Sequence, residues 1–336
     1  MEDREGPTLE DLKTTATETR IGTTADWRKQ ARRWTDKAKH LLWGRQGNDG
    51  LMLKTVVYAL LVIVGFVYVY PLLFMTSQSF KSLKDLLDPT IGWIPRQLEW
   101  SNYTQAWHVL HYMQALGTSL LNSVLPAVAQ TVSCAVVGYG FAKYKFPGKP
   151  VLFALMMITF VVPKQVVMIP MFLMFKEYHM LETPLPFIVP GLFAQGLRGA
   201  LFVLIFVQFF RTIPVALEEA ASIDGAGALK TFYRIILPIS VPAIVVVFLF
   251  SMVWHWNETY LASLYLGNAM TTLPQELKTF NDSFKAMYTG GAKITDVNEA
   301  IRMAGTLLIV LPLLALYLFA QKYFTQVVDK TGLTGE

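Results

Sequence analysis

The sequence predicts an all-α polytopic membrane protein with six transmembrane helices. Hydrophobic residues make up 53% of the chain, charged residues 16%, and the mean hydropathy is +0.40, which is too apolar for an ordinary soluble domain. A membrane span needs about 20 mostly apolar residues, because each adds about 1.5 Å across a hydrocarbon core of about 30 Å. Six stretches qualify, at residues 55–75, 119–142, 151–172, 187–210, 241–265 and 303–324.

Residues 1–50 form a polar extension that is acidic at its start and basic toward its end. It lacks an apolar core followed by a small-residue cleavage site, so it does not resemble a secretory signal peptide. Within it, one face of a predicted helix carries Trp27, Ala31, Trp34, Ala38 and Leu41, with Lys and Arg mostly elsewhere. We expect this basic amphipathic helix to lie in the headgroup layer of an anionic leaflet. Packing against a partner subunit is the open alternative.

The loops between the predicted spans set the orientation of the chain. The N-terminal extension, residues 143–149, residues 219–238 and the C-terminal tail hold most of the Lys and Arg. Because basic loops stay in the cytoplasm, we expect a cytoplasmic N-terminal extension, a transmembrane domain at 51–324 and a cytoplasmic tail at 325–336. The net charge of +5 is small, and membrane lipid accounts for it without nucleic acid as a partner.

Residues 212–238 are too polar to cross a bilayer, although they lie between two predicted spans. Two amphipathic helical patterns flank a turn at Gly225, which can adopt backbone angles closed to other residues. Glu218, Glu219 and Asp224 are expected to keep the first pattern in water, and Pro238 to end the second. The stretch therefore predicts a docking element on the cytoplasmic side. A solvated loop without a partner is the alternative.

This stretch resembles the EAA loop of permease subunits in ABC-type importers, through Glu219-Ala220-Ala221, Gly225, Ile235 and Leu237-Pro238. In that family the loop forms coupling helices that sit in a cleft of the ATP-hydrolysing subunit. The resemblance implies that Glu219 helps to hold that subunit, that Ala220 and Ala221 pack closely, and that Gly225 makes the turn. The implied ATPase-coupling residues are Glu219, Ala220, Ala221, Asp224, Gly225, Ile235, Leu237 and Pro238.

Two further motifs, GYGFAKYKFPGK at 138–149 and Trp256-Asn257-Glu258, resemble carbohydrate permeases, and the maltose-type second permease subunit is the closest match. The resemblance covers most of the chain from residue 55 onward. It implies a permease in the bacterial inner membrane that forms a heterodimer with a second permease. Two ATP-binding subunits and an extracytoplasmic binding protein are the other implied partners. Val207 departs from the family, in which an arginine commonly stands before Gln-Phe-Phe.

Lys164 and Arg198 fall inside two of the predicted spans, where a charge costs at least ~2.5 kcal/mol unless it meets water, a partner or a substrate. One interpretation is that both face the translocation path and favour a substrate with carboxylates or dense hydroxyl groups. Pairing with a carboxylate of the second permease, or snorkelling at a misplaced span boundary, is the alternative.

The fifth predicted span carries a cluster of residues suited to sugars, because aromatic faces stack on sugar rings and polar groups bond to hydroxyls. The candidate path residues there are Trp254, Trp256, Asn257 and Glu258. The alternative is that they pack and hydrogen-bond at the outer end of the subunit interface.

The sequence predicts no enzyme active site and no cofactor in this chain. The GAGALKT stretch at 225–231 lacks the Walker A spacing, so the resemblance leaves ATP and Mg²⁺ to the partner ATPases. His108 and His111 have no third ligand nearby, so no metal site is predicted. An ion-coupled secondary transporter would need intramembrane carboxylates, of which Glu258 is almost the sole candidate. A membrane scaffold is the third possibility.

Overall fold

The computed structural model describes residues 50–288 and 298–330, with side chains to residue 323. Within these residues the chain is helical and contains no strand, as the sequence predicts. It divides into two units, Met1–Phe74 and Met75–Glu336, which are described separately below. The predicted basic helix near residues 27–43 lies outside the described residues.

Helix α2 (Leu51–Ser79) supplies the described part of the first unit and runs beyond the predicted span at both ends. Its apolar side chains are exposed on every face, from Leu51 through Phe74. A helix that is apolar all round is suited to lipid or to a neighbouring helix rather than to water. Its length and hydropathy qualify it as a membrane span.

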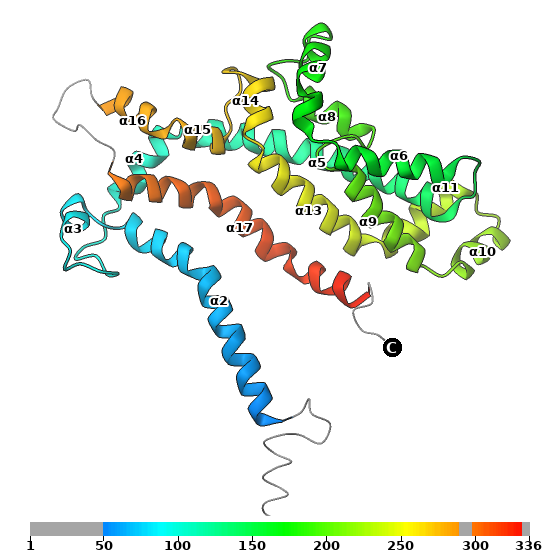
Figure 1. Ribbon diagram of the computed structural model, residues 1–336, viewed down its shortest axis with the longest axis horizontal. Coiled ribbons are helices and arrows are strands. Elements are labelled where there is room, and N and C mark those ends of the chain that lie inside the picture. The colour runs from blue at the N-terminus through cyan, green and yellow to red at the C-terminus, as the bar shows by residue number, and fades with distance from the viewer. Residues whose placement is uncertain (1–49, 289–297, 331–336) are drawn as a thin grey trace, which may run out of the picture. The chain divides into compact units, whose positions relative to one another are not determined.

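The second unit is built around α5 (Tyr112–Lys143), which packs against α9 (Gly199–Thr212) and α13 (Val241–Asn257) (Figure 1). Their shared core is aromatic and aliphatic, with Cys134, Phe202, Phe206, Phe210 and Val247 buried together. Gly138 of α5 lets this contact close, because an added Cβ would lie 2.6 Å from the Phe206 Cβ. Between helices in a bilayer such contacts stabilise the bundle through close van der Waals packing.

A second core forms toward one end of this unit, where the last helix, α17 (Glu299–Lys330), packs against α4 (Ser101–Val109) and α13. Short helices α15 (Leu273–Lys278) and α16 (Phe280–Tyr288) cover this core, and α3 (Leu83–Leu87) lies in the preceding loop. The buried members include Leu110, Trp256, Leu273, Phe280 and Ala304.

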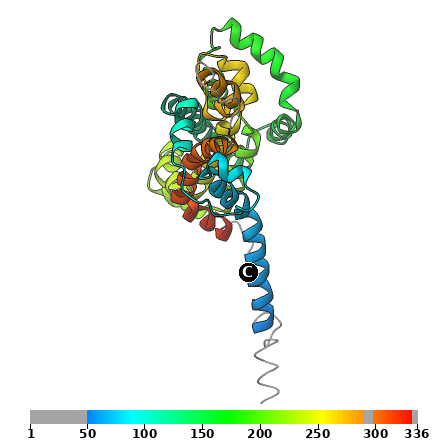
Figure 2. The same ribbon diagram turned by 90° about the vertical axis from the view of Figure 1, so that its left-hand side faces the viewer.

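The third, fourth and fifth spans are not the continuous helices that the sequence predicts. The 151–172 stretch breaks into α6 (Lys149–Val161) and α7 (Lys164–Glu177) with a 95° bend, so that α6 is seen nearly end-on in Figure 2 while α7 is seen along its length. Pro163 lacks an N–H and disfavours helix at the residue before it, and Val162 is accordingly extended.

The two other breaks have different causes. The 187–210 stretch divides into α8 (Leu185–Leu192) and α9, and Ala194 and Arg198 between them have positive φ. The 241–265 stretch divides into α13 and α14 (Tyr260–Leu266), where Glu258 binds the first amides of α14. Among the described helices, three are long and apolar enough to span a membrane. The number rises to as many as six if three bent pairs each count as one span, namely Lys149–Val161 with Lys164–Glu177, Gly199–Thr212 with Ala216–Ile223, and Ala228–Ile239 with Val241–Asn257.

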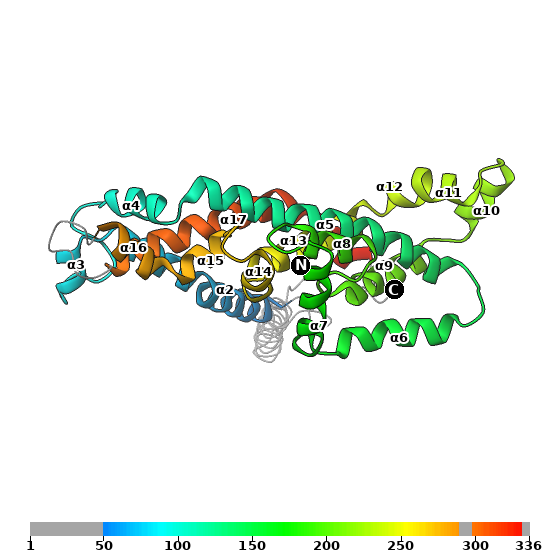
Figure 3. The same cartoon turned by 90° about the horizontal axis from the view of Figure 1, so that it is seen from above.

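The 212–238 stretch folds back as a hairpin of α10 (Ala216–Ile223), α11 (Ala228–Thr231), the π-helix η1 (Phe232–Ile236) and α12 (Leu237–Ile239). Figure 3 shows α10 to α12 at one end of the second unit, with α4 and α16 toward the other. Pro238 does not end the second helix as predicted, since α12 continues to Ile239. Proline donates no backbone hydrogen bond, and the chain before Pro238 forms a wider π-helical turn in which the Leu237 N–H donates to the Phe232 carbonyl oxygen.

Candidate functional site

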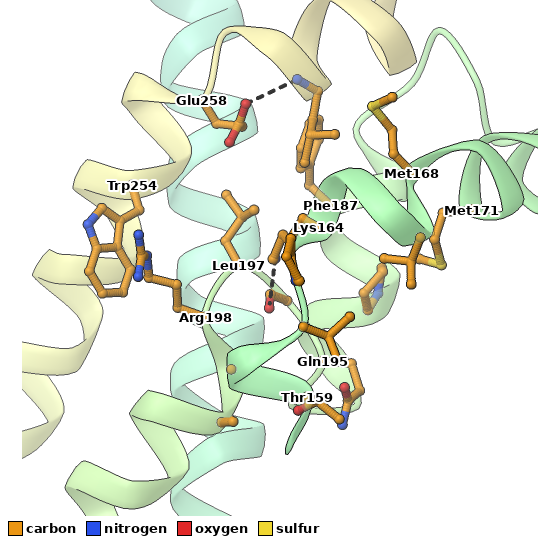
Figure 4. A pocket seen from close by; sticks show the side chains of 18 of the residues that line it. Thr159, Lys164, Met168, Met171, Phe187, Gln195, Leu197, Arg198, Trp254 and Glu258 are labelled. Atoms are coloured by element: carbon orange, nitrogen blue, oxygen red, sulfur yellow. Dashed lines mark hydrogen bonds between the residues drawn. The ribbon is translucent and has the colours of Figure 1, made fainter. Parts of the chain in front are cut away.

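The three helix breaks meet at one cavity of about 950 Å³, lined by residues of α6 to α9, α13 and α14. Figure 4 shows the labelled charged groups, Lys164, Arg198 and Glu258, each beside a break, together with Met168, Met171 and Phe187 on the apolar walls. Irregular backbone at membrane depth is tolerated where it lines a cavity or is buried in protein. The breaks therefore come together around a hollow that the sequence did not predict.

Lys164 is the first residue of α7 and does not lie in the middle of a span. Its Nζ donates to the Gly196 carbonyl oxygen at 3.4 Å across the cavity, and its side chain is exposed to the hollow. No described residue forms a salt bridge with it. The charge is thus presented at a helix start and stays available to an anionic group.

Arg198 precedes α9 in a left-handed backbone conformation, with φ of 56°. Its guanidinium lies 4.8 Å from the centre of the Trp254 ring, and in Figure 4 the side chain turns toward that ring. Trp254 in turn stacks on Phe202 with ring centres 5.2 Å apart. The cation–π contact orients the guanidinium without neutralising it, and no described carboxylate pairs with it.

A buried amide supports the 193–198 break from behind. Gln130 of α5 is fully buried, and its Nε2 donates to the Leu197 carbonyl oxygen at 2.8 Å. Its Oε1 accepts from the Ser251 hydroxyl of α13 at 3.0 Å. An added Cβ at Gly196 would lie only 2.8 Å from the same Oε1, so glycine is required for this approach. Gln130 therefore ties the break to two spans at once.

Glu258 and Asn257 line the cavity, but both are engaged locally. The Glu258 Oε1 accepts from the backbone amides of Tyr260 at 3.1 Å and Leu261 at 3.0 Å, at the start of α14. Asn257 donates to the Val253 carbonyl oxygen one turn back in α13. The carboxylate thus caps α14, whereas Lys164 and Arg198 form no salt bridge with a described residue.

Trp256 does not line this cavity. It is buried in the second core with Ala106, Leu273 and Ile309. Trp256 thus packs inside this chain and not at the subunit interface of the alternative interpretation, whereas Trp254, two residues earlier, lines the cavity.

His255 lines the cavity and received no role from the sequence. Its Nδ1 lies 2.8 Å from the Ser251 carbonyl oxygen, which can only accept, so Nδ1 carries the proton in the neutral ring. Nε2 is then an acceptor, and it is buried without a hydrogen-bond partner among the described residues. The signal for this group, and for Gln130, was an uncharged polar side chain inside a predicted span, which needs a partner there.

The hairpin at 212–238 leaves apolar side chains in the open. Ile223 at the end of α10 is 86% exposed and Leu229 in α11 is 80% exposed. Glu219, Ala220 and Asp224 are also exposed on α10. Gly225 has φ of 74°, which is the backbone conformation that the predicted turn needs, and an added Cβ would have nothing within 4 Å.

Other hairpin residues face the bundle. Ala221 is buried, and Ile235 and Leu237 are half-buried, while Pro238 is exposed. Glu218 was predicted to lie in water, but its carboxylate pairs with Lys143 at the end of α5, with Nζ and Oε1 2.9 Å apart. Successive residues of a helix point to different sides, so Glu218 faces the bundle while Glu219 is exposed.

Comparison with known proteins identifies the family. The model of the binding-protein-dependent transport system inner membrane component matches residues 135–330. The diacetylchitobiose uptake system permease of Streptomyces coelicolor is 26% identical over 274 residues, covering 80% of this chain and 84% of the relative. The polygalacturonan/rhamnogalacturonan transport system permease of Bacillus subtilis is 26% identical over 276 residues, covering 81% and 94%.

A solved structure has the same fold. It is the crystal structure of a bacterial ABC transporter involved in the import of the acidic polysaccharide alginate, with a TM-score of 0.66 and 20% identity, covering 81% of this chain and 96% of that one. The family match extends over more than half of the chain and includes the hairpin and all three of the cavity's breaks. The chain therefore belongs to the family of binding-protein-dependent transport system inner membrane components, the permease subunits of ABC transporters.

Proposed function

We propose that this chain forms half of the translocation pathway of an ATP-driven importer in a bacterial inner membrane. A second permease completes the pathway as a heterodimer, two partner subunits bind ATP and Mg²⁺, and an extracytoplasmic protein delivers the substrate. Both termini and the 212–238 hairpin face the cytoplasm in this proposal, as the distribution of Lys and Arg supports. Family membership favours this assignment over an ion-coupled transporter or a scaffold.

The observation that carries the proposal is the exposure of Ile223 and Leu229, the two most exposed of the large apolar side chains on the hairpin. Large apolar side chains that stand out from a polar surface mark places where a protein partner binds. Glu219 and Asp224 beside them supply polar contacts at the rim. Closure of the ATPases on ATP would move this hairpin and open the bundle outward, and hydrolysis would reset it.

Co-purification tests the ATPase contact. The chain is expressed with the neighbouring permease and ATPase genes, and the ATPase retained by a tag on this chain is measured. We expect Ile223→Glu and Leu229→Glu to abolish retention, because each places a charge in a desolvated contact. Ile94→Glu is the matched control, since Ile94 is 84% exposed in the loop before α4. Full retention by both hairpin variants, or an equal loss with Ile94→Glu, would contradict the proposal.

For the substrate we propose an oligosaccharide that carries carboxylates. Lys164 and Arg198 present two cations to the cavity, whereas the Glu258 carboxylate is bound to backbone amides. Trp254 offers an aromatic face on the same wall, on which a sugar ring can stack. The named substrates of two similar proteins, polygalacturonan and alginate, support this class.

Uptake by cells tests the charge preference. We expect Lys164→Met to reduce uptake of an oligogalacturonate by about tenfold or more, and uptake of a neutral oligosaccharide of equal length by much less, since only the first loses an ion pair. Lys176→Met, which removes an exposed lysine near the other end of α7 without touching the cavity, is the control. Equal losses for both sugars would refute a role of Lys164 in selecting acidic substrates.

A further inference from the structure

The hairpin and the cavity are both attached to one helix, α5. At the end of α5, the Lys143 Nζ donates to the Ile213 carbonyl oxygen at 2.8 Å and pairs with the Glu218 carboxylate at 2.9 Å. The two charged side chains are only 8% and 21% exposed. Since a shielded pair is screened less by salt and water than a surface pair, this contact holds α10 to α5 firmly.

The second half of the hairpin is attached to the same turns of α5. The Tyr139 ring lies 4.8 Å from the Phe232 ring of η1 and 5.7 Å from the Phe210 ring of α9. Ile236 of η1 is fully buried in the same core. Both halves of the hairpin therefore meet the bundle at the last two turns of α5, while the tip with Ile223 and Leu229 stays exposed.

Farther along α5, polar side chains bind the backbone at the cavity. Gln130 donates to the Leu197 carbonyl oxygen, and the Ser133 hydroxyl donates to the Gly191 carbonyl oxygen at 2.5 Å. Gln130 and Lys143 are separated by roughly 20 Å along the helix, at 1.5 Å per residue. The segment between them contains no proline, since Pro126 of α5 lies before it. Although the segment includes Gly138 and Gly140, it is one unbroken α-helix, and Gly138 is packed against Phe206.

We propose that α5 is the rigid link between the ATPase-docking hairpin and the substrate cavity, and that Lys143 is the positioning residue that connects the hairpin to it. A displacement of α10 pulls on Glu218 and thereby on α5, and α5 carries it through Gln130 and Ser133 to the break that presents Arg198. This inference rests on the proposed function, because it needs an ATPase on the hairpin.

Thiol accessibility measures the link without knowledge of the substrate. Cys134 is the only cysteine of the sequence and is fully buried, so a cysteine placed at the exposed cavity residue Gln195 is labelled against a low background. The purified complex of permeases and ATPases is treated with a charged maleimide, with and without ATP and orthovanadate. Thr104→Cys, at an exposed position of α4, is the control for unspecific changes of labelling.

In the chain with Gln195→Cys alone, we expect ATP and vanadate to change the labelling rate by about fivefold or more. Adding Lys143→Met should reduce that change to less than about twofold, whereas Lys143→Arg should preserve most of it. The double variant Lys143→Glu with Glu218→Lys restores the opposite charges and should restore the response. Recovery by exchange of the two charges would show that the ion pair, and not either side chain alone, carries the ATP response.

The outcomes separate this inference from the proposed function. If no ATPase co-purifies with the unmodified chain, the proposed function fails and the inference falls with it. If the ATPase co-purifies and Lys143→Met keeps the full labelling response, only the inference is overturned. If Lys143→Met loses the ATPase, the charge exchange must recover both retention and response. A failure to recover them overturns the inference as well.

Discussion

The 193–198 break and the 212–238 hairpin both interrupt apolar helices with polar residues, but the bundle supports them differently. The break is held from behind by Gln130, which is fully buried and satisfied on both sides of its amide. The hairpin is held only at its base, and Ile223 and Leu229 at its tip touch little of the bundle. The conformation of the break is thus fixed by contacts within this chain, whereas the tip of the hairpin presents an exposed surface to which a partner can bind.

The largest effect should come from closing the space at the break. In Gly199→Ala, the new Cβ would lie 2.1 Å from the Ala194 carbonyl oxygen, which is backbone and cannot move aside. We expect the free energy of unfolding to fall by about 3 kcal/mol. Thermal exposure of the buried Cys134 to a thiol-reactive dye measures it. Gly140→Ala on α5, where nothing lies within 4 Å, is the control, and equal melting temperatures would contradict the packing described here.

Removing the support behind the break should have the next largest effect. Gln130→Leu keeps the volume but leaves the Leu197 carbonyl and the Ser251 hydroxyl without their buried partner, at a cost of about 2 kcal/mol. The same thiol assay detects it, and uptake should fall because Arg198 loses its fixed position. Val132→Leu, an exposed site on the same turn, should leave both unchanged. A stable Gln130→Leu protein with normal uptake would show that the 193–198 break keeps its conformation without Gln130.

How far the sequence predicts this architecture differs between the two regions. The hairpin was placed correctly, because its polarity and its glycine turn are local features that need no knowledge of the fold. The helix breaks were not, because a window of apolar residues cannot distinguish one straight span from two short helices. Pro163 is a local signal for a break, but a left-handed Arg198 and a capping Glu258 are stabilised by Gln130 and by the amides of α14, contacts that exist only in three dimensions.

The dependence on three-dimensional contacts also explains which site residues could be predicted from the sequence. Lys164 and Arg198 were selected because charges are costly inside spans, and Glu258 because its motif suits sugar hydroxyls; the structure brings all three to one cavity. Trp254 and Trp256 could not be separated by composition, and only their positions on α13 place one at the cavity and the other in the core. Gln130 and His255 were missed because an uncharged polar side chain in a span gives a weaker signal than a charge.

A smaller effect is expected at the hairpin turn. Gly225→Ala would force a side chain into a left-handed conformation at a cost of roughly 1–2 kcal/mol. Because nothing packs on this residue, the melting of the bundle core should hardly change, and the loss should appear as weaker ATPase retention. Gly227→Ala is the matched control, since Gly227 has φ of −71° and open space around it. Equal retention by the two variants would mean that the turn at Gly225 does not shape the docking surface.

The smallest effect should come from the third break, where Glu258 combines a structural contact with a charge in the cavity. Glu258→Ala removes the acceptor for the Tyr260 and Leu261 amides and should destabilise α14 by about 1 kcal/mol, measured as faster hydrogen exchange of these amides. Glu258→Gln keeps an acceptor oxygen and should leave their exchange nearly unchanged. If both variants transport a neutral sugar equally but Glu258→Gln improves uptake of an acidic one, the carboxylate opposes anionic substrates. If Glu258→Gln instead speeds exchange as much as Glu258→Ala does, the negative charge itself stabilises the start of α14. The break at Glu258 would then depend on electrostatics, whereas the 193–198 break depends on packing.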